Sequence, residues 1–162
     1  PLDVHLMISN PLEQLDWYLS AGADIVTAHI EAFASDAEVR EFIERVRDAG
    51  KKPALTLKPD CAIESLDAYI ADLDMVRVFP GFSGQSYIEG SEDRVAHVAH
   101  VASKENPLLL IEVDGGISAS RTAGLVCAKG ADVLVAGSGV FAAPNPKDAV
   151  HEIRQSGINA QK

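Results

Sequence analysis

Residues 108–139 read LLLIEVDGGISASRTAGLVCAKGADVLVAGSG, and this stretch decides the fold class. The apolar run Leu108–Val113 is followed by a helix-like stretch, Ser120–Lys129, and by a second apolar run, Val133–Ala136. Short apolar runs that do not alternate with polar residues are typical of strands buried on both faces of a parallel sheet. Gly130 stands where a helix C-terminus favours glycine. The stretch therefore predicts a strand, a crossover helix and a second, parallel strand.

The same alternation fills the rest of the chain. Further strands are predicted at Leu2–Ile8, Asp24–Ile30, Pro53–Leu57 and Asp74–Phe79. Further helices are predicted at Leu12–Ser20, Asp36–Ala49, Ile63–Ala71, Glu92–Ser103 and Lys147–Gln155. These six βα units occupy 162 residues, whereas a compact (β/α)₈ barrel takes roughly 200–250. Periodicity alone leaves two architectures open, an open doubly wound sheet and an incomplete barrel.

Composition is that of a single globular domain, expected over residues 1–162. Hydrophobic residues make up 47%, charged residues 23%, and the formal net charge is -10. This acidic balance argues against nucleic-acid and anionic-membrane partners, which require a basic surface. Cys61 and Cys127 lack disulfide or metal-site spacing, which favours a cytoplasmic location. The apolar runs are too short to cross a bilayer.

Glycine and polar residues gather where the predicted strands end, which is where ligands bind in parallel α/β folds. Gly115-Gly116 follows one strand and Gly137-Ser138 follows the next. Glycine lets the backbone approach an anion closely, and backbone amides then bind phosphate. Either pair alone could be an ordinary turn. Two such turns on consecutive final strands favour a phosphate site.

Asp114 and His5 are the candidate chemical groups. Asp114 ends an apolar strand, and a buried carboxylate needs a partner, a metal or a proton. Capping of the next helix is the alternative for Asp114, and a satisfied core position is the alternative for His5. His29 and Glu31 also share one face of a strand, but they rank below the His5/Asp114 pair. The segment from Pro80 to Gln85, PGFSGQ, predicts a mobile lid.

Taken together, these motifs resemble the ribulose-phosphate 3-epimerases. The segments that carry the resemblance are Asp3-Val4-His5-Leu6-Met7, Ala21-Gly22-Ala23-Asp24, His29-Ile30-Glu31-Ala32, Pro80-Gly81-Phe82-Ser83-Gly84-Gln85, Val113-Asp114-Gly115-Gly116-Ile117 and Ala136-Gly137-Ser138-Gly139-Val140-Phe141. The match begins at the family's third strand. The resemblance implies a (β/α)₈ TIM barrel, here with about six units, truncated at its N-terminal side.

The resemblance also implies an isomerase that inverts C3 of D-ribulose 5-phosphate through an enediolate. His5 and Asp114 would bind a divalent metal cation (Zn, Fe, Mn or Co), and Asp114 would also act as one of two acid/base carboxylates. The residues that would contact the sugar phosphate are His5, Met7, Gly81, Phe82, Ser83, Gly84, Asp114, Gly115, Gly116, Gly137 and Ser138. The family's place in the pentose phosphate pathway and its frequent homo-oligomers are implied as well.

Departures from the family pattern predict an impaired chain. The family's second strand, which carries a metal-binding His and a metal-binding Asp that is also the second acid/base, has no counterpart here. The strand before the lid reads Met75-Val76-Arg77-Val78-Phe79, where the family has a Met facing the site. Two alternatives stay open: a hexulose-6-phosphate (allulose-6-phosphate) 3-epimerase, and a non-catalytic protein that binds or assembles around a phosphosugar.

Overall fold

A computed structural model describes residues 1–79 and 87–161, in which strands and helices alternate as predicted. The strands are β1 (Asp3–Leu6), β2 (Ile25–His29), β3 (Lys52–Thr56), β4 (Met75–Val78), β5 (Leu110–Asp114) and β6 (Val133–Val135). The α-helices are α1 (Pro11–Ser20), α2 (Asp36–Asp48), α3 (Ser91–Glu105), α4 (Thr122–Ala128), α5 (Ser138–Phe141) and α6 (Pro146–Ala160). Two 3₁₀ helices, η1 (Ile30–Ala32) and η2 (Ile63–Asp72), complete the described elements.

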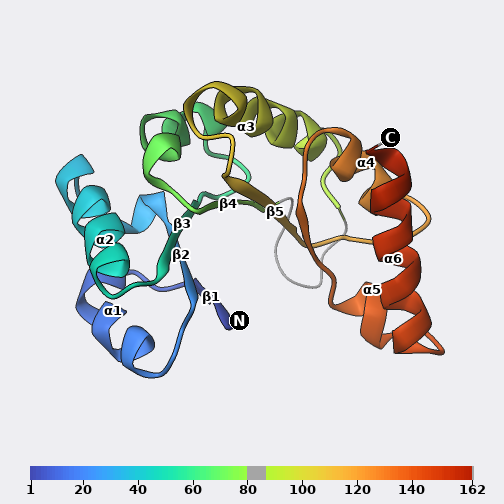
Figure 1. The fold of residues 1–162 in the computed structure, drawn as a ribbon, viewed down its shortest axis with the longest axis horizontal. Helices are drawn as coiled ribbons and strands as arrows, with labels where there is room; N and C mark the ends of the chain where they lie inside the picture. The colour runs from blue at the N-terminus through green and yellow to red at the C-terminus, as the bar shows by residue number, and fades with distance from the viewer. Residues whose placement is uncertain (80–86, 162) are drawn as a thin grey trace.

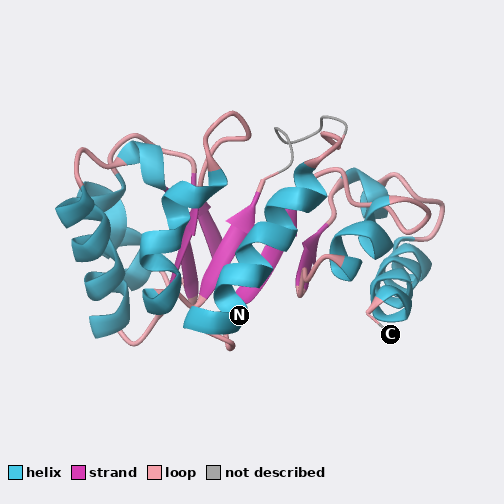
Figure 2. Ribbon diagram, turned by 90° about the horizontal axis from the view of Figure 1, so that it is seen from above, coloured by secondary structure: helices cyan, strands magenta, loops and turns pink. Residues whose placement is uncertain are grey.

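All described strands belong to one parallel sheet in the order β1-β2-β3-β4-β5-β6. The sheet curves into an arc, and the helices cover its convex side (Figures 1 and 2). The arc leaves β1 and β6 at its two ends, each paired on one side within the described sheet. This arrangement confirms the prediction of an incomplete (β/α) barrel.

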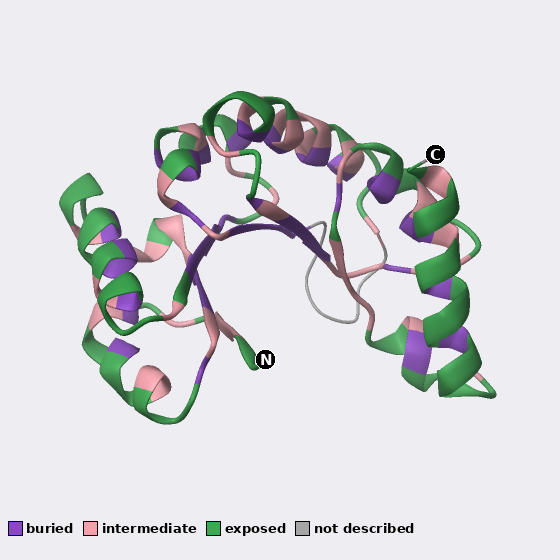
Figure 3. Cartoon of the chain, in the orientation of Figure 1, coloured by how far each residue is buried: buried purple, intermediate pink, exposed green. Residues whose placement is uncertain are grey.

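The core lies between the sheet and the helices. Leu15 on α1, Phe42 on α2, Val98 on α3 and Val126 on α4 are fully buried against strand residues such as Leu55. Each helix shows an exposed outer face and a buried inner face (Figure 3). Burial of these apolar faces is the main force that holds the helices to the sheet.

The repeated Gly-Ala-Asp sequence has a structural role at two strand starts. Gly22 and Gly130 adopt positive φ angles of 101° and 110° just after their helices, as expected of C-terminal glycines. The aspartate that follows then reaches the neighbouring strand: Oδ2 of Asp24 accepts from the N–H of Leu2 at 2.8 Å, and Oδ2 of Asp132 accepts from the N–H of Ile111 at 3.0 Å. The repeat therefore ends a helix and fixes the next strand beside its neighbour.

One local prediction differs from the structure. The segment predicted as a helix at Ile63–Ala71 forms the 3₁₀ helix η2, and no side chain caps its first turn. The turn predicted at Gly137-Ser138 leads directly into the short helix α5, which begins at Ser138. No helix of the described chain is both long and apolar enough to span a membrane.

Candidate functional site

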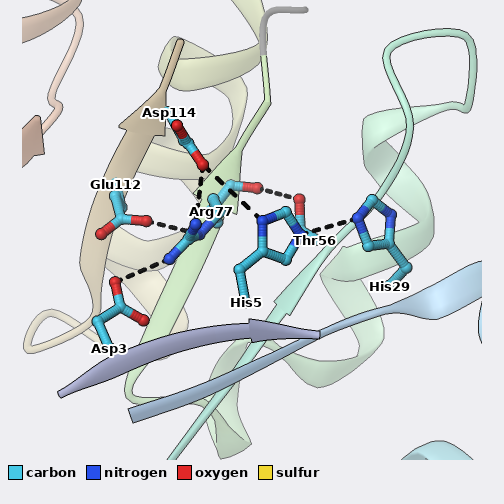
Figure 4. Close-up of polar contacts among 7 residues, drawn as sticks. All are labelled: Asp3, His5, His29, Thr56, Arg77, Glu112 and Asp114. Carbon is cyan, nitrogen blue, oxygen red and sulfur yellow. Dashed lines mark hydrogen bonds and ion pairs between the residues drawn. The ribbon is translucent and has the colours of Figure 1, made fainter. Parts of the chain in front are cut away.

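The predicted pair Asp114 and His5 meets on the concave side of the sheet. Asp114 ends β5 and His5 lies on β1, four strands away in the sheet order. The curvature of the sheet brings Nδ1 of His5 to 3.8 Å from Oδ2 of Asp114 (Figure 4). Both side chains are largely buried, at 9% and 22% exposed. The structure thus brings together the two residues chosen as candidate chemical groups.

His29 joins this pair directly, which the sequence did not reveal. Its Nε2 lies 2.8 Å from Nε2 of His5, so one ring donates a hydrogen bond and the other accepts it. The rings stack with centroids 4.9 Å apart. Burial, together with the nearby charge of His5, lowers the pKa of His29 despite the carboxylate of Glu31. His29 is therefore held in its neutral form more firmly than a free imidazole.

Glu31 lies beyond His29, with Oε2 3.6 Å from His29 Nδ1. Its Oε1 accepts hydrogen bonds from the N–H of Lys58 at 2.6 Å and from the thiol of Cys61 at 3.3 Å. Burial raises the pKa of Glu31, but these hydrogen bonds outweigh it and the net shift is downward. Glu31 is therefore a fixed carboxylate at the ends of β2 and β3.

A cavity of about 390 Å³ opens beside these side chains. Its lining includes Met7, Ser9, His29, Glu31, Lys58 and Phe79. Met7 lines this cavity and is 66% exposed, and its contact with a ligand stays a prediction. A larger hollow of about 570 Å³ lies between α6 and β6, but none of the predicted site residues lines it.

Arg77 on β4 is the residue whose role at the site the sequence interpretation missed. Its side chain is 5% exposed and lies among three carboxylates on the concave side (Figure 4). Nη1 donates to Oδ2 of Asp114, and Nη2 donates to Oδ2 of Asp3, each at 2.8 Å. The available signal was a charged residue inside an apolar strand, since such a residue needs buried partners.

Glu112 is the third carboxylate at Arg77. The two residues are register partners across β4 and β5, and Nε of Arg77 lies 2.6 Å from Oε1 of Glu112. The two atoms form an ion pair, but their orientation does not give a hydrogen bond in the described structure. Burial raises the pKa of Glu112 to about 8, with the carboxylates of Asp3 and Asp114 adding to the shift and Arg77 opposing it. One cation therefore serves a cluster of three acids.

Asp114 responds to the same surroundings in the opposite direction. Burial raises its pKa, but the nearby imidazole of His5 and the guanidinium of Arg77 outweigh burial, and the net shift is downward. Asp114 is consequently an ionised carboxylate, with a guanidinium within hydrogen-bond distance.

The donors on the concave side do not fit the divalent metal that the resemblance implies. His5 and Asp114 supply two ligands, and the Asp114 oxygen that faces His5 also accepts from Arg77. Across residues 1–79 and 87–161, no three His, Cys, Asp or Glu side chains gather into a group that could hold a metal ion. Tight zinc sites use three or four protein ligands.

The two glycine-rich segments of the predicted phosphate site lie side by side, and phosphate binding by them stays a prediction. Gly115 and Gly116 have φ angles of 116° and 64°, and a Cβ on Gly116 would come within 2.8 Å of the backbone of Tyr87. A Cβ on Gly139 would overlap the carbonyl oxygen of Ile117, so the turn after β6 packs directly on the turn after β5. Gly137 and Ser138 begin α5 at this junction. Gly81, Phe82, Ser83 and Gly84, the predicted lid contacts, lie outside the described residues.

Comparison with known proteins agrees with this arrangement. The ribulose-phosphate 3 epimerase family matches residues 1–141. The ribulose-phosphate 3-epimerase of Bacillus subtilis is 38% identical over 160 residues, which cover 96% of this chain and 72% of that protein. The ribulose-phosphate 3-epimerase of Aquifex aeolicus is 33% identical over 163 residues, covering 99% and 72%.

A solved structure shares the fold at lower sequence identity. The 3-hexulose-6-phosphate synthase of Salmonella typhimurium superposes with a TM-score of 0.68 at 22% identity, over 98% of this chain and 72% of that one. The family match and the relatives confirm the resemblance carried by the motifs. The chain belongs to the ribulose-phosphate 3-epimerase family.

Proposed function

We propose that the site on the concave side of the sheet acts on D-ribulose 5-phosphate and exchanges the proton on its C3 carbon. The observation that carries the proposal is the position of Asp114, an ionised carboxylate at the end of β5 that is followed directly by the Gly115-Gly116 turn. In a chain of this family, that arrangement supports a proton-transfer group next to a phosphate-binding backbone.

The phosphate would bind at the adjoining turns of Gly115-Gly116 and Gly137-Ser138. Because glycine has no side chain, the backbone N–H groups of these turns can approach an anion closely. The sugar would then extend toward Asp114 and His5, with Met7 lining the far side of the space. Residues 81–84 are proposed contacts on the resemblance alone.

Asp114 would remove the C3 proton as a general base. A base must lie within hydrogen-bond reach of the proton, and its ionised form must be populated. The lowered pKa of Asp114 satisfies the second condition at neutral pH, although a more weakly basic carboxylate transfers a proton less readily. Inversion also requires a proton donor on the opposite face of C3. In this proposal solvent water delivers that proton to the enediolate while Asp114 holds the proton it removed, so we expect epimerisation to be slow.

Hydrogen–deuterium exchange at C3 tests this proposal. Proton NMR of D-ribulose 5-phosphate in D₂O, with the chain present, would follow loss of the C3 proton and formation of D-xylulose 5-phosphate together. We expect slow exchange that is abolished by Asp114→Asn, which keeps the shape of the side chain but removes its basicity. Absence of exchange with bound substrate would overturn the catalytic proposal and favour a non-catalytic phosphosugar-binding protein.

The substrate's length is tested in the same assay. D-allulose 6-phosphate, one carbon longer, should exchange more slowly than D-ribulose 5-phosphate. Faster exchange of the longer substrate would support the hexulose-phosphate alternative instead. The predicted homo-oligomer, cytoplasmic location and pathway are separate proposals that this assay does not address.

A further inference from the structure

The guanidinium of Arg77 occupies the centre of the carboxylate cluster on the concave side (Figure 4). We propose that Arg77 is a built-in cation that takes the place of a divalent metal beside Asp114 and prevents the His5/Asp114 pair from binding one. This proposal concerns cation binding alone, so it does not depend on which sugar phosphate the site accepts.

The guanidinium is held from three directions. Asp114 and Asp3 each accept one of its N–H groups at 2.8 Å, and Glu112 faces Nε at 2.6 Å. These carboxylates come from β5 and β1, on either side of the concave space, while Arg77 itself comes from β4. At 5% exposure, the side chain is shielded from water that would otherwise weaken the ion pairs. Turning it away would leave the partly buried carboxylate of Asp114 without its cation, which is costly.

Two of the atoms that a metal could use at this pair, Oδ2 of Asp114 and Nε2 of His5, already have partners. Oδ2 of Asp114 is the oxygen that faces His5, and the same oxygen accepts from Arg77. The far nitrogen of His5, Nε2, is paired with His29 at 2.8 Å. A divalent cation between His5 and Asp114 would lie beside a fixed positive charge in a partly buried space, where repulsion between like charges is strong.

Removal of the guanidinium would reverse this situation. Asp3, Glu112 and Asp114 all reach Arg77, so without it they would face a common space together with the imidazole of His5. Carboxylate oxygens and imidazole nitrogens are the ligands that Zn²⁺, Co²⁺ and Mn²⁺ accept. The proposal therefore predicts a gain of metal affinity on mutation of Arg77, which a purely structural role of Arg77 does not predict.

The test is a titration with Co²⁺, whose visible absorption reports its ligands. The variant is Arg77→Met with Glu112→Gln, because the glutamine keeps this buried side chain neutral at every pH and leaves Asp3, Asp114 and His5 as the groups that could bind the metal. We expect the unaltered chain to show no saturable Co²⁺ band, and R77M/E112Q to bind Co²⁺ about 10- to 100-fold more tightly, the range over which neighbours of metal ligands alter affinity. Adding His5→Ala should abolish the new band.

Two control variants make the outcome decisive. Arg77→Lys keeps a positive charge, so it should not gain Co²⁺ affinity. Arg45→Met removes an arginine that pairs with Asp16 at 2.8 Å on the helical side of the sheet, and it should not gain Co²⁺ affinity either. Stoichiometric Co²⁺ binding by the unaltered chain, lost in His5→Ala, would overturn the proposal. So would a folded R77M/E112Q that binds no better than the unaltered chain. If R77M/E112Q does not fold, the comparison of the unaltered chain with His5→Ala decides: equal, unsaturable Co²⁺ uptake supports the proposal.

Discussion

Gly116 shows at the scale of one residue how the predicted phosphate site depends on backbone shape. Its φ of 64° lies in the left-handed region, and the backbone of Tyr87 lies 2.8 Å from where a Cβ would stand. Gly116→Ala should therefore destabilise the fold by roughly 1–3 kcal/mol, through backbone strain and overpacking. Urea unfolding measures this loss.

Gly137 provides the matched control. It also begins a predicted phosphate turn, but its φ is -85° and no atom lies within 4 Å of its added Cβ. Gly137→Ala should change the unfolding free energy by less than about 0.5 kcal/mol. Equal destabilisation by the two substitutions would contradict the proposed close packing of Gly116 on Tyr87.

Glu112 gives the molecule a pH dependence with a defined sign. Its pKa is about 8 in the folded chain, above the ordinary value of 4.5, so the folded state holds the proton more tightly than the unfolded state. The stabilising contribution of the proton is complete below about pH 4.5 and is lost as the pH rises toward 8. The unfolding free energy should fall by a few kcal/mol across that interval.

The variant Glu112→Gln isolates this effect from other titrating groups. His29 has a lowered pKa, so its neutral form adds stability that is lost as the pH falls below its ordinary value of 6.5. Urea unfolding between about pH 7 and pH 9 therefore avoids His29. The slope in this window should be smaller in Glu112→Gln than in the unaltered chain. Identical slopes would show that Glu112 is ionised throughout.

The sequence predicted those residues of the site whose position is fixed by the strand on which they lie. Asp114 and His5 stand on apolar strands, so their faces and their end of the sheet follow from a period of two. The contacts of Arg77 with Asp3 and of His5 with His29 were not predictable in this way. The Arg77–Asp3 contact joins residues on strands three apart, and its existence depends on the curvature of the sheet.

At the scale of elements, the strands were predicted to within a few residues because buried parallel strands are recognisable as short apolar runs. The sequence did not predict that η2 is a 3₁₀ helix. Its apolar residues recur at spacings of three and one, which suit a 3₁₀ helix as well as an α-helix; they are Ile63, Leu66, Tyr69 and Ile70. Whether the backbone adopts the 3₁₀ or the α-helical hydrogen-bond pattern depends on tertiary contacts. One such contact is made by Asn106, whose Nδ2 donates hydrogen bonds to the carbonyls of Ile70 and Leu73.

The repeated Gly-Ala-Asp sequence makes a testable contribution to strand pairing. Oδ2 of Asp132 accepts from the N–H of Ile111 at the start of β5. Asp132→Ala should cost about 0.5–1.5 kcal/mol of stability and speed hydrogen exchange at the Ile111 amide. Asp132→Asn retains an acceptor oxygen, so its stability and its exchange rate at Ile111 should lie between those of the unaltered chain and those of Asp132→Ala. Unchanged exchange at Ile111 in Asp132→Ala would contradict the role of this hydrogen bond.

At the scale of the whole molecule, the described residues form an arc of six strands whose two ends present strand edges. β1 and β6 each pair on one side within the described sheet, and unpaired strand edges favour association with another chain. The hollow between α6 and β6 adds apolar surface at one end, with Val150 and Ile158 on α6 exposed by 53% and 42%. The net charge of -10 opposes association, and this repulsion is screened by salt.

These opposing terms predict that the chain associates with a second copy through the α6 end, and more strongly at high ionic strength. Val150→Glu with Ile158→Glu should weaken association about tenfold or more, because it places charge on the apolar surface while leaving the buried residues of α6, such as Ile153, intact. Trp17→Glu is the matched control, since Trp17 is 68% exposed but lies on α1, at the opposite end of the arc (Figure 1). Sedimentation equilibrium over a range of concentrations and salt measures the effect. A chain that stays monomeric at every concentration, or that dissociates equally in Trp17→Glu, would show that the α6 end is not the contact surface and that the exposed apolar groups there stay in water.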